Sequence, residues 1–137
     1  MRRVTATENT YFGVRITQQG SYYAGSVTDS NLSGNGPGGN GIGLAVQANN
    51  ITVRNNVIDG NQFGVVVLTG LSWLEDNDIT GNVNAGIYLG AAAHLNTIVR
   101  NFITIKTIPV NDVGGGNHVG AFSSTASSSD VWSNIVY

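Results

Sequence analysis

A repeated motif is the strongest constraint on what this chain can fold into. Residues Asn55–Asn61 read Asn-Asn-Val-Ile-Asp-Gly-Asn, and the pattern recurs at Asp76–Asn82 as Asp-Asn-Asp-Ile-Thr-Gly-Asn. A glycine and a short apolar alternation follow each copy, at Gly64 and Gly86, which are about 22 residues apart. A fixed period of this length is typical of solenoids, in which each repeat buries its apolar face against the next one. The sequence therefore predicts a solenoid.

The same alignment produces the apolar columns that a stacked core requires. Five glycines open the aligned copies: Gly13, Gly43, Gly64, Gly86 and Gly120. Two columns follow them, one holding Val14, Leu44, Val65, Ile87 and Ala121, and the other Ile16, Val46, Val67, Leu89 and Ser123. Two more hold Val27, Val53, Leu74, Ile98 and Val131, and Leu32, Ile58, Ile79, Ile103 and Val136. Because alternate residues of a strand point to opposite faces, each column can point inward.

The columns predict strands, since no stretch carries a sustained apolar stripe of helical period. The β-branched residues that fill many of the positions suit strands, and Gly-Asn corners tolerate the positive φ of a tight turn. An aligned polar column holds Ser30, Asn56, Asn77, Asn101 and Asn134. Stacked amides of this kind hydrogen-bond from one rung to the next. We therefore expect about five rungs of about 22 residues, with an asparagine ladder at one corner.

Two segments depart from the regular spacing. Residues 34–43 are glycine-rich, and residues 106–117 contain Pro109 and three consecutive glycines. The distance from Gly86 to Gly120 exceeds the period by about a dozen residues. We expect one domain over residues 1–137, with both segments as loop insertions that leave the solenoid. The last residues read as the first half of a further rung, so we also expect the chain to be either a fragment of a longer solenoid or a subunit whose ends are covered by partners.

The motif Asn-x-Ile-x-Gly-Asn, followed by Gly-apolar-x-apolar, resembles the right-handed parallel β-helix repeat family. That family includes pectate-lyase-like enzymes, alginate epimerases, NosD-type repeat proteins and phage tailspikes. The resemblance covers residues 4–137 and implies an all-β fold, a right-handed single-stranded parallel β-helix. The motif is specific for the fold and weak for function, because unrelated functions share this fold.

Composition argues against several classes of function. Charged residues make up 10% of the chain and the net charge is −2, which gives no basic footprint for nucleic acid. No apolar run is long enough to insert into a membrane, and no apolar stretch follows Met1 to form a signal peptide. The chain has no cysteine, and the glycine-rich segment lacks the carboxylates that calcium prefers. We expect no metal and no cofactor.

Four charged residues fall into neighbouring rows of the aligned rungs. Arg54 and Glu75 share one position, and Asp76 and Arg100 share another. One interpretation is a surface ladder of ion pairs. The other is a carbohydrate groove in which these four residues are the candidate catalytic groups. The resemblance implies acid–base chemistry on polysaccharides, but the epimerase, polygalacturonase and pectin methylesterase signatures are all missing, so enzymatic activity stays uncertain.

A second candidate feature is an outward stripe. Between the two inward positions after each glycine lie Arg15, Ala45, Val66, Tyr88 and Phe122. We expect Val66, Tyr88 and Phe122 to form an exposed apolar stripe, with Trp73 near the start of its own rung. An exposed apolar patch marks an interface. Aromatic faces also stack on sugar rings, and a third interpretation is that the insertions cover the stripe.

Two hypotheses of function follow. The first is a non-catalytic structural or recognition module that self-associates, as a trimer for example, and contacts cell-surface or extracellular polysaccharide. Such a module would resemble a tailspike and lie outside the cell or on a virion surface. The alternative is a segment of a polysaccharide lyase, hydrolase or epimerase of the pectate-lyase-like class. The missing catalytic motifs, the low charge and the apolar stripe favour the first.

Overall fold

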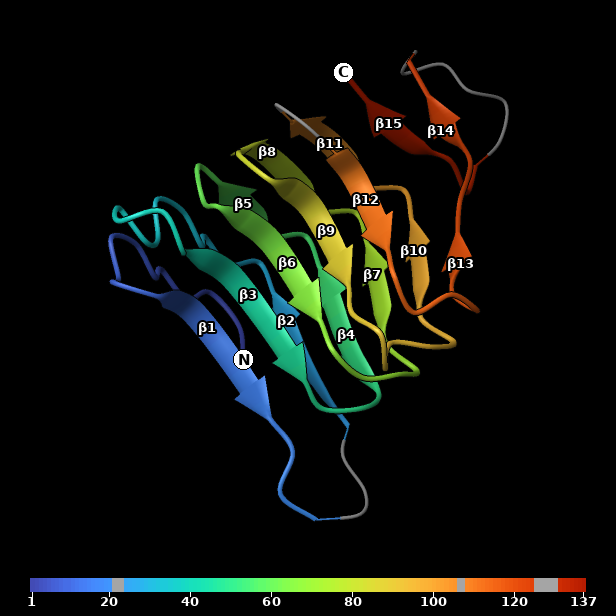
Figure 1. Ribbon diagram of the computed structural model, residues 1–137, viewed down its shortest axis with the longest axis horizontal. Helices are drawn as coiled ribbons and strands as arrows, with labels where there is room; N and C mark the ends of the chain where they lie inside the picture. Colours follow the sequence, from blue (N-terminus) through green and yellow to red (C-terminus); the bar gives the residue numbers. More distant parts are fainter. Residues whose placement is uncertain (21–23, 106–107, 125–130) are drawn as a thin grey trace.

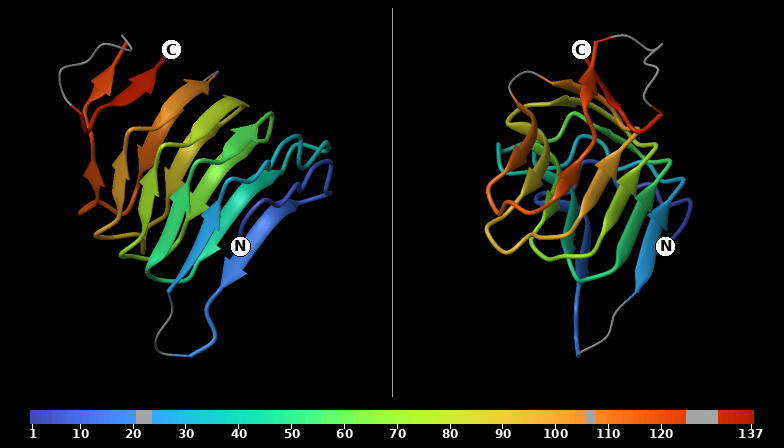
Figure 2. Two further views of the ribbon diagram at one scale, coloured as in Figure 1. Left: turned by 180° about the vertical axis from the view of Figure 1, so that it is seen from behind. Right: turned by 90° about the vertical axis from the view of Figure 1, so that its right-hand side faces the viewer.

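The computed structural model describes residues 1–20, 24–105, 108–124 and 131–137, and it confirms the predicted fold. The chain coils into a right-handed parallel β-helix whose strands line three faces around one core (Figures 1 and 2). The coil makes about four turns, slightly fewer than the five rungs expected. The part of the chain that the structure describes contains no helical segment that could span a lipid bilayer.

Three five-stranded parallel sheets form these faces. Sheet 1 contains, in spatial order, β1 (Phe12–Thr17), β3 (Ile42–Gln47), β6 (Phe63–Val67), β9 (Ala85–Leu89) and β12 (Ile108–Asp112). Sheet 2 contains β2 (Gly25–Thr28), β4 (Ile51–Arg54), β7 (Trp73–Glu75), β10 (Thr97–Val99) and β13 (His118–Val119). Sheet 3 contains β5 (Val57–Asp59), β8 (Asp78–Asn82), β11 (Phe102–Ile105), β15 (Asn134–Val136) and β14 (Phe122–Ser123).

The inward columns form a continuous apolar core through the middle rungs. Leu44 pairs in register with Val65, and Val65 with Ile87, and all three are fully buried. The column of sheet 3 also holds to its end, since Ile103 pairs with Val136. Each residue in such a column meets identical or similar neighbours above and below, so the stack packs without gaps.

The alignment of the fifth rung was wrong in three columns. Val110, rather than Ala121, pairs with Ile87, and Asp112, rather than Ser123, pairs with Leu89. In sheet 2, Val119 pairs with Ile98, whereas Val131 is 70% exposed. The alignment fails here because Gly120 opens no strand of sheet 1 and lies instead between β13 of sheet 2 and β14 of sheet 3.

The segment expected as a loop at 106–117 contributes a strand, since residues 108–112 form β12 against β9. Residues 106–107 lie outside the described residues. Pro109 signalled a loop, but β12 is the last strand of sheet 1, and proline is tolerated at such an edge because its missing N–H has no partner strand to serve. Later in the chain the strand order is irregular, because β15 lies between β11 and β14. A Cβ on Gly120 would clash with the backbone of Trp132, so the glycine permits this close approach.

The glycine-rich segment at 34–43 departs from the coil less than expected. Asn35 is buried within the stack, and Ile42 and Gly43 already belong to β3. The irregular part is a tight turn in which the N–H of Gly39 donates to the carbonyl of Gly36 at 2.9 Å. Both glycines have positive φ, a conformation that glycine adopts without steric cost.

The predicted asparagine ladder is confirmed. The Asn77 amide donates to the side-chain oxygen of Asn101 at 2.9 Å and to the carbonyl of Val53 at 2.9 Å. The backbone and amide N–H groups of Asn56 in turn donate to the side-chain oxygen of Asn77. Each side chain therefore binds the rungs on both sides.

Two further ladders were missed from the sequence. One runs through Asn9, Asn35, Asn61 and Asn82, and the other through Ser72, Asn96 and Asn117. The first of these was already present in the repeat as its final Gly-Asn. A ladder therefore lies at each of the three corners of the coil.

At most levels of the ladders, a residue with positive φ stands directly before the corner position, and Asn134 is the exception. At the corner from sheet 2 to sheet 3, these residues are Arg3, Asp29, Asn55, Asp76 and Arg100, with φ between 52° and 55°. At the other corners they are Glu8, Gly34, Gly60 and Gly81, and Asn50, Leu71, Leu95 and Gly116. The left-handed residue turns the chain at the corner. The ladder side chain then bonds the backbone amides that the turn leaves unpaired.

The ladders also explain the repeated glycine of sheet 1. A Cβ on Gly64 would lie 2.9 Å from the amide nitrogen of Asn82 and 2.5 Å from the carbonyl oxygen of Gly86. Gly43 faces Asn61 in the same way, at 2.8 Å. The glycine and the asparagine of the motif are therefore two parts of one packing arrangement.

The ladder predicts a large penalty for Asn77→Ala. The substitution leaves the backbone N–H of Asn56 and the carbonyl of Val53 without side-chain partners inside the core. At about 1–3 kcal/mol for each buried unsatisfied group, the free energy of unfolding should fall by about 3 kcal/mol. Urea denaturation measures this loss. The control Asn84→Ala removes an exposed amide and should cost less than about 0.5 kcal/mol. Equal losses in both variants would contradict a structural role of the ladder.

Candidate functional site

The four charged residues predicted from the sequence do lie together, at the corner between sheets 2 and 3. Arg100 contacts Asp76 through its Nε at 2.9 Å and also pairs with Glu75. Arg54 approaches the same two carboxylates, with its Nε 3.3 Å from Asp76 and 3.6 Å from Glu75. Two cations and two anions are thus mutually neutralised, and we call this set the charged corner.

The electrostatics of the charged corner favour a structural network. The hydrogen bond from Arg100 lowers the pKa of the Asp76 carboxyl below its usual value, and the same bond raises the pKa of the Arg100 guanidinium. A carboxylate with a lowered pKa holds no proton to donate near neutral pH. Asp76 is therefore poorly suited to act as a general acid.

An aromatic pocket lies beside the charged corner, on the outer face of sheet 2. Five residues line it: Trp73, Thr97, Val99, His118 and Trp132. The strand register places Thr97 between Trp73 and His118, so these three share one outward column. Trp132 reaches the pocket from the segment before β15, and the guanidinium carbon of Arg100 lies 5.5 Å from its ring centre. We call these five residues the Trp pocket.

The Trp pocket has half-exposed aromatic rings as its walls and a buried aliphatic side chain at its base. Trp73 is 40% exposed and Trp132 is 48% exposed, whereas Val99 is buried. Glu75 pairs in register with Val99, so the charged corner borders the pocket. The sequence indicates Trp73 and Trp132 as aromatic residues near the start of their rungs, but Thr97 and Val99 carry no signal in the sequence. His118 was missed because Val131, instead of Val119, was aligned with Ile98. The correct alignment would have placed His118 in the column of Trp73.

The expected outward stripe on sheet 1 is not an exposed surface. Val66 is only 8% exposed, and Tyr88 packs its edge against Phe63 with ring centres 5.8 Å apart. Phe122 belongs to β14 in sheet 3, and Asn111 takes the position beside Tyr88. The prediction failed because Val66 is covered by its neighbours and because the alignment of the fifth rung placed Phe122 in the wrong sheet.

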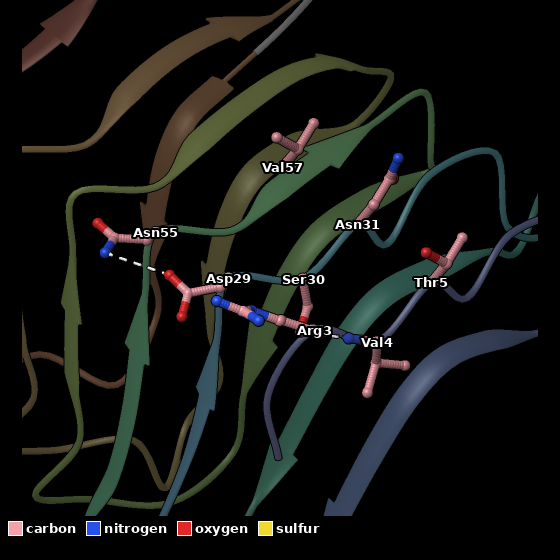
Figure 3. A pocket seen from close by; sticks show the side chains of 8 residues that line it. All are labelled: Arg3, Val4, Thr5, Asp29, Ser30, Asn31, Asn55 and Val57. Carbon is pink, nitrogen blue, oxygen red and sulfur yellow. Dashed lines mark hydrogen bonds between the residues drawn. The ribbon is translucent and has the colours of Figure 1, made fainter.

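A third feature lies at the N-terminal end of the same corner column (Figure 3). Arg3, Asp29 and Asn55 stand on one side of this second pocket, and Thr5, Asn31 and Val57 on the other. Asp29 is bound by Arg2 at 2.7 Å, and the hydrogen bond from Arg2 lowers the pKa of the Asp29 carboxyl. We call this feature the Arg3 pocket.

Sheet 3 carries a carboxylate in the opposite electrostatic state. Burial raises the pKa of the Asp78 carboxyl, and the nearby charge of Asp59 adds to the effect. Asp59 itself accepts a hydrogen bond from the hydroxyl of Thr80 at 3.1 Å. Asp76 and Asp78, two residues apart, are thus shifted in opposite directions.

This contrast predicts opposite effects of two substitutions on stability. The pKa of Asp76 is lowered on folding, so its contribution is present above its unfolded pKa of about 3.9 and is lost as pH falls through the folded value. Asp76→Asn, which tolerates the same positive φ, should therefore lower stability at pH 7. The pKa of Asp78 is raised, so its contribution is lost as pH rises, and Asp78→Asn should raise stability at pH 7.

Urea denaturation of the two variants at pH 7 and pH 3 checks both signs. The gain from Asp78→Asn should shrink at pH 3, where Asp78 of the natural chain is largely protonated. The loss from Asp76→Asn should persist further toward acid. Changes of the same sign at pH 7 would show that these charge interactions do not control stability.

A comparison with protein-family models matches residues 2–136 to a family described as "Periplasmic copper-binding protein (NosD)". No curated protein and no solved structure matches the chain. Copper favours thiolate, thioether and imidazole ligands, but the chain has no cysteine, and its described part contains no group of three or more His, Cys, Asp or Glu residues that could hold a metal. The described residues therefore do not fit a copper site. Because the match spans almost the whole solenoid, the chain belongs to the NosD family of right-handed β-helix proteins.

Proposed function

We propose that this chain is a non-catalytic recognition module that binds polysaccharide in the Trp pocket. The observation that carries the proposal is the pair of half-exposed tryptophans around the buried Val99. Ligand pockets commonly combine apolar and aromatic walls with a few polar groups that fix orientation. Thr97 and His118 supply such groups here.

Sugar rings suit this combination of groups. A pyranose has an apolar C–H face, which stacks on an indole, and hydroxyls at its edge, which need hydrogen-bond partners. The hydroxyl of Thr97 can donate or accept, and so can the two ring nitrogens of His118. The outward column of sheet 2 places one residue on each successive strand, about 4.8 Å apart, so an extended polymer can lie along it.

The charged corner supports binding rather than catalysis. Arg54 and Arg100 each contact both carboxylates, so each of the four groups is held by opposite charge. A lyase, hydrolase or epimerase would need one of them as a free acid or base beside the substrate. The alternative is favoured only by the position of Glu75 next to the pocket. It predicts depolymerisation that Glu75→Gln abolishes.

The description of the family as periplasmic supports a location on the envelope side or outside the cell. That location suits a module that meets polysaccharide. Self-association, with a trimer as one form, and placement on a virion surface stay predictions. The burial of Val66 removes part of the surface on which self-association was predicted.

The proposal predicts that Trp73→Ala weakens polysaccharide binding about tenfold, because loss of one stacking partner removes about 1.4 kcal/mol. The wild-type chain is first screened against envelope and extracellular polysaccharides, and Kd is then measured by calorimetry. The control Tyr11→Ala removes an exposed aromatic ring far from the pocket in the sequence and should leave Kd unchanged. An unchanged Kd for Trp73→Ala, or no binding to any glycan, would refute the proposal.

A further inference from the structure

The Arg3 pocket plays no part in the function proposed above, yet it has the composition of a ligand site. It spans the first rungs, where Thr5, Asn31 and Val57 align through single bridges of sheet 3. Val57 is 42% exposed and forms an apolar surface between the polar groups. The arrangement again offers an apolar patch with hydrogen-bonding groups around it (Figure 3).

The polar groups around Val57 have hydrogen-bonding capacity to spare. The side-chain oxygen of Asn31 accepts a bond from the hydroxyl of Ser33, which leaves its amide nitrogen available as a donor. The amide of Asn55 reaches Asp29 only at 3.5 Å, at the limit of a hydrogen bond. The hydroxyl of Thr5 faces the same pocket. These donors and acceptors match the hydroxyls of a sugar.

The charge of the Arg3 pocket differs from that of the charged corner. Arg2 already neutralises Asp29, and among the described residues no carboxylate lies within ion-pair distance of Arg3. Arg2, which pairs with Asp29 from outside the pocket lining, and Arg3 are thus two cations beside one carboxylate, which leaves a net positive charge at the pocket. At the other end of the column, by contrast, Arg54 and Arg100 are fully matched by Glu75 and Asp76.

We propose that the Arg3 pocket binds the carboxylate of an acidic saccharide, with Arg3 as the ion-pairing residue. A guanidinium binds a carboxylate by two parallel hydrogen bonds, which fixes direction as well as charge. The inference rests on the proposed function and narrows it, because the polysaccharide is then one that contains uronic acid units.

The two pockets are placed to act on one polymer. Arg3 and Arg100 occupy the first and last positions of the same corner column, separated by four steps between rungs. At about 4.8 Å for each step, this separation is about 19 Å along the axis. An oligosaccharide that follows the corner can therefore contact the Trp pocket with one unit and Arg3 with another.

The test compares two ligands that differ only in charge. One is an oligomer of a uronic acid, and the other is the same oligomer with its carboxylates methyl-esterified. Calorimetry with the wild-type chain should give a Kd about tenfold lower for the acidic oligomer, and added NaCl should reduce this preference. Arg3→Gln should remove the preference without changing binding of the ester. Glutamine, like arginine, is not β-branched, so the positive φ at this position costs both about equally.

The matched control is Arg15→Gln, which removes the same charge from an exposed site on sheet 1 and should keep the preference. Equal binding of acid and ester by the wild-type chain would overturn the inference while leaving the proposed function intact. Displacement of the acidic oligomer by inorganic phosphate, at an equal concentration of negative charge, would show a general anion site. That result would also overturn the inference. Failure of both oligomers together with all neutral glycans would overturn the proposed function itself.

Discussion

Buried amide ladders are the interaction on which the rest of this structure depends. A chain that turns three times in each rung exposes backbone N–H and C=O groups at every corner, and these groups cannot be left unpaired inside a core. The side chain of Asn77 meets this need, because its oxygen accepts from the rung before and its nitrogen donates to the rung after. The ladders thus bond the corners and fix the rungs in register.

Because the register is fixed, equivalent residues of successive rungs stack into columns on the outer surface of the solenoid. Once Asn56 lies below Asn77 and Asn101, the residues just before them must stack as well, which brings Asp76 onto Arg100. The same stacking on sheet 2 sets Trp73 beside Thr97. The charged corner and the column of Trp73 therefore follow from the repeat that builds the core, and Trp132 is added to the Trp pocket by the irregular segment before β15.

The sequence predicted the middle rungs well because their period is regular, and a regular period reveals which residues meet. The prediction failed where a residue has a different structural role from the residues aligned with it in other rungs. Gly120 allows the close return of Trp132, whereas the earlier glycines make room for the ladder, and one alignment cannot separate these reasons. Val66 shows another limit, because periodicity gives the direction of a side chain but not how far its neighbours cover it.

At the corner from sheet 2 to sheet 3, the fold constrains the backbone conformation of a residue but not the charge of its side chain. All five of its left-handed residues have φ near 54°, yet they include two arginines, two aspartates and one asparagine. The backbone therefore requires a residue that tolerates positive φ, at a cost of about 1–2 kcal/mol for a non-glycine residue, and leaves its charge free. Each position can then change sign without disturbing the ladder beside it. Binding specificity can vary along this column while the solenoid stays the same, which is why membership of the family determines the fold and leaves the ligand to the individual residues.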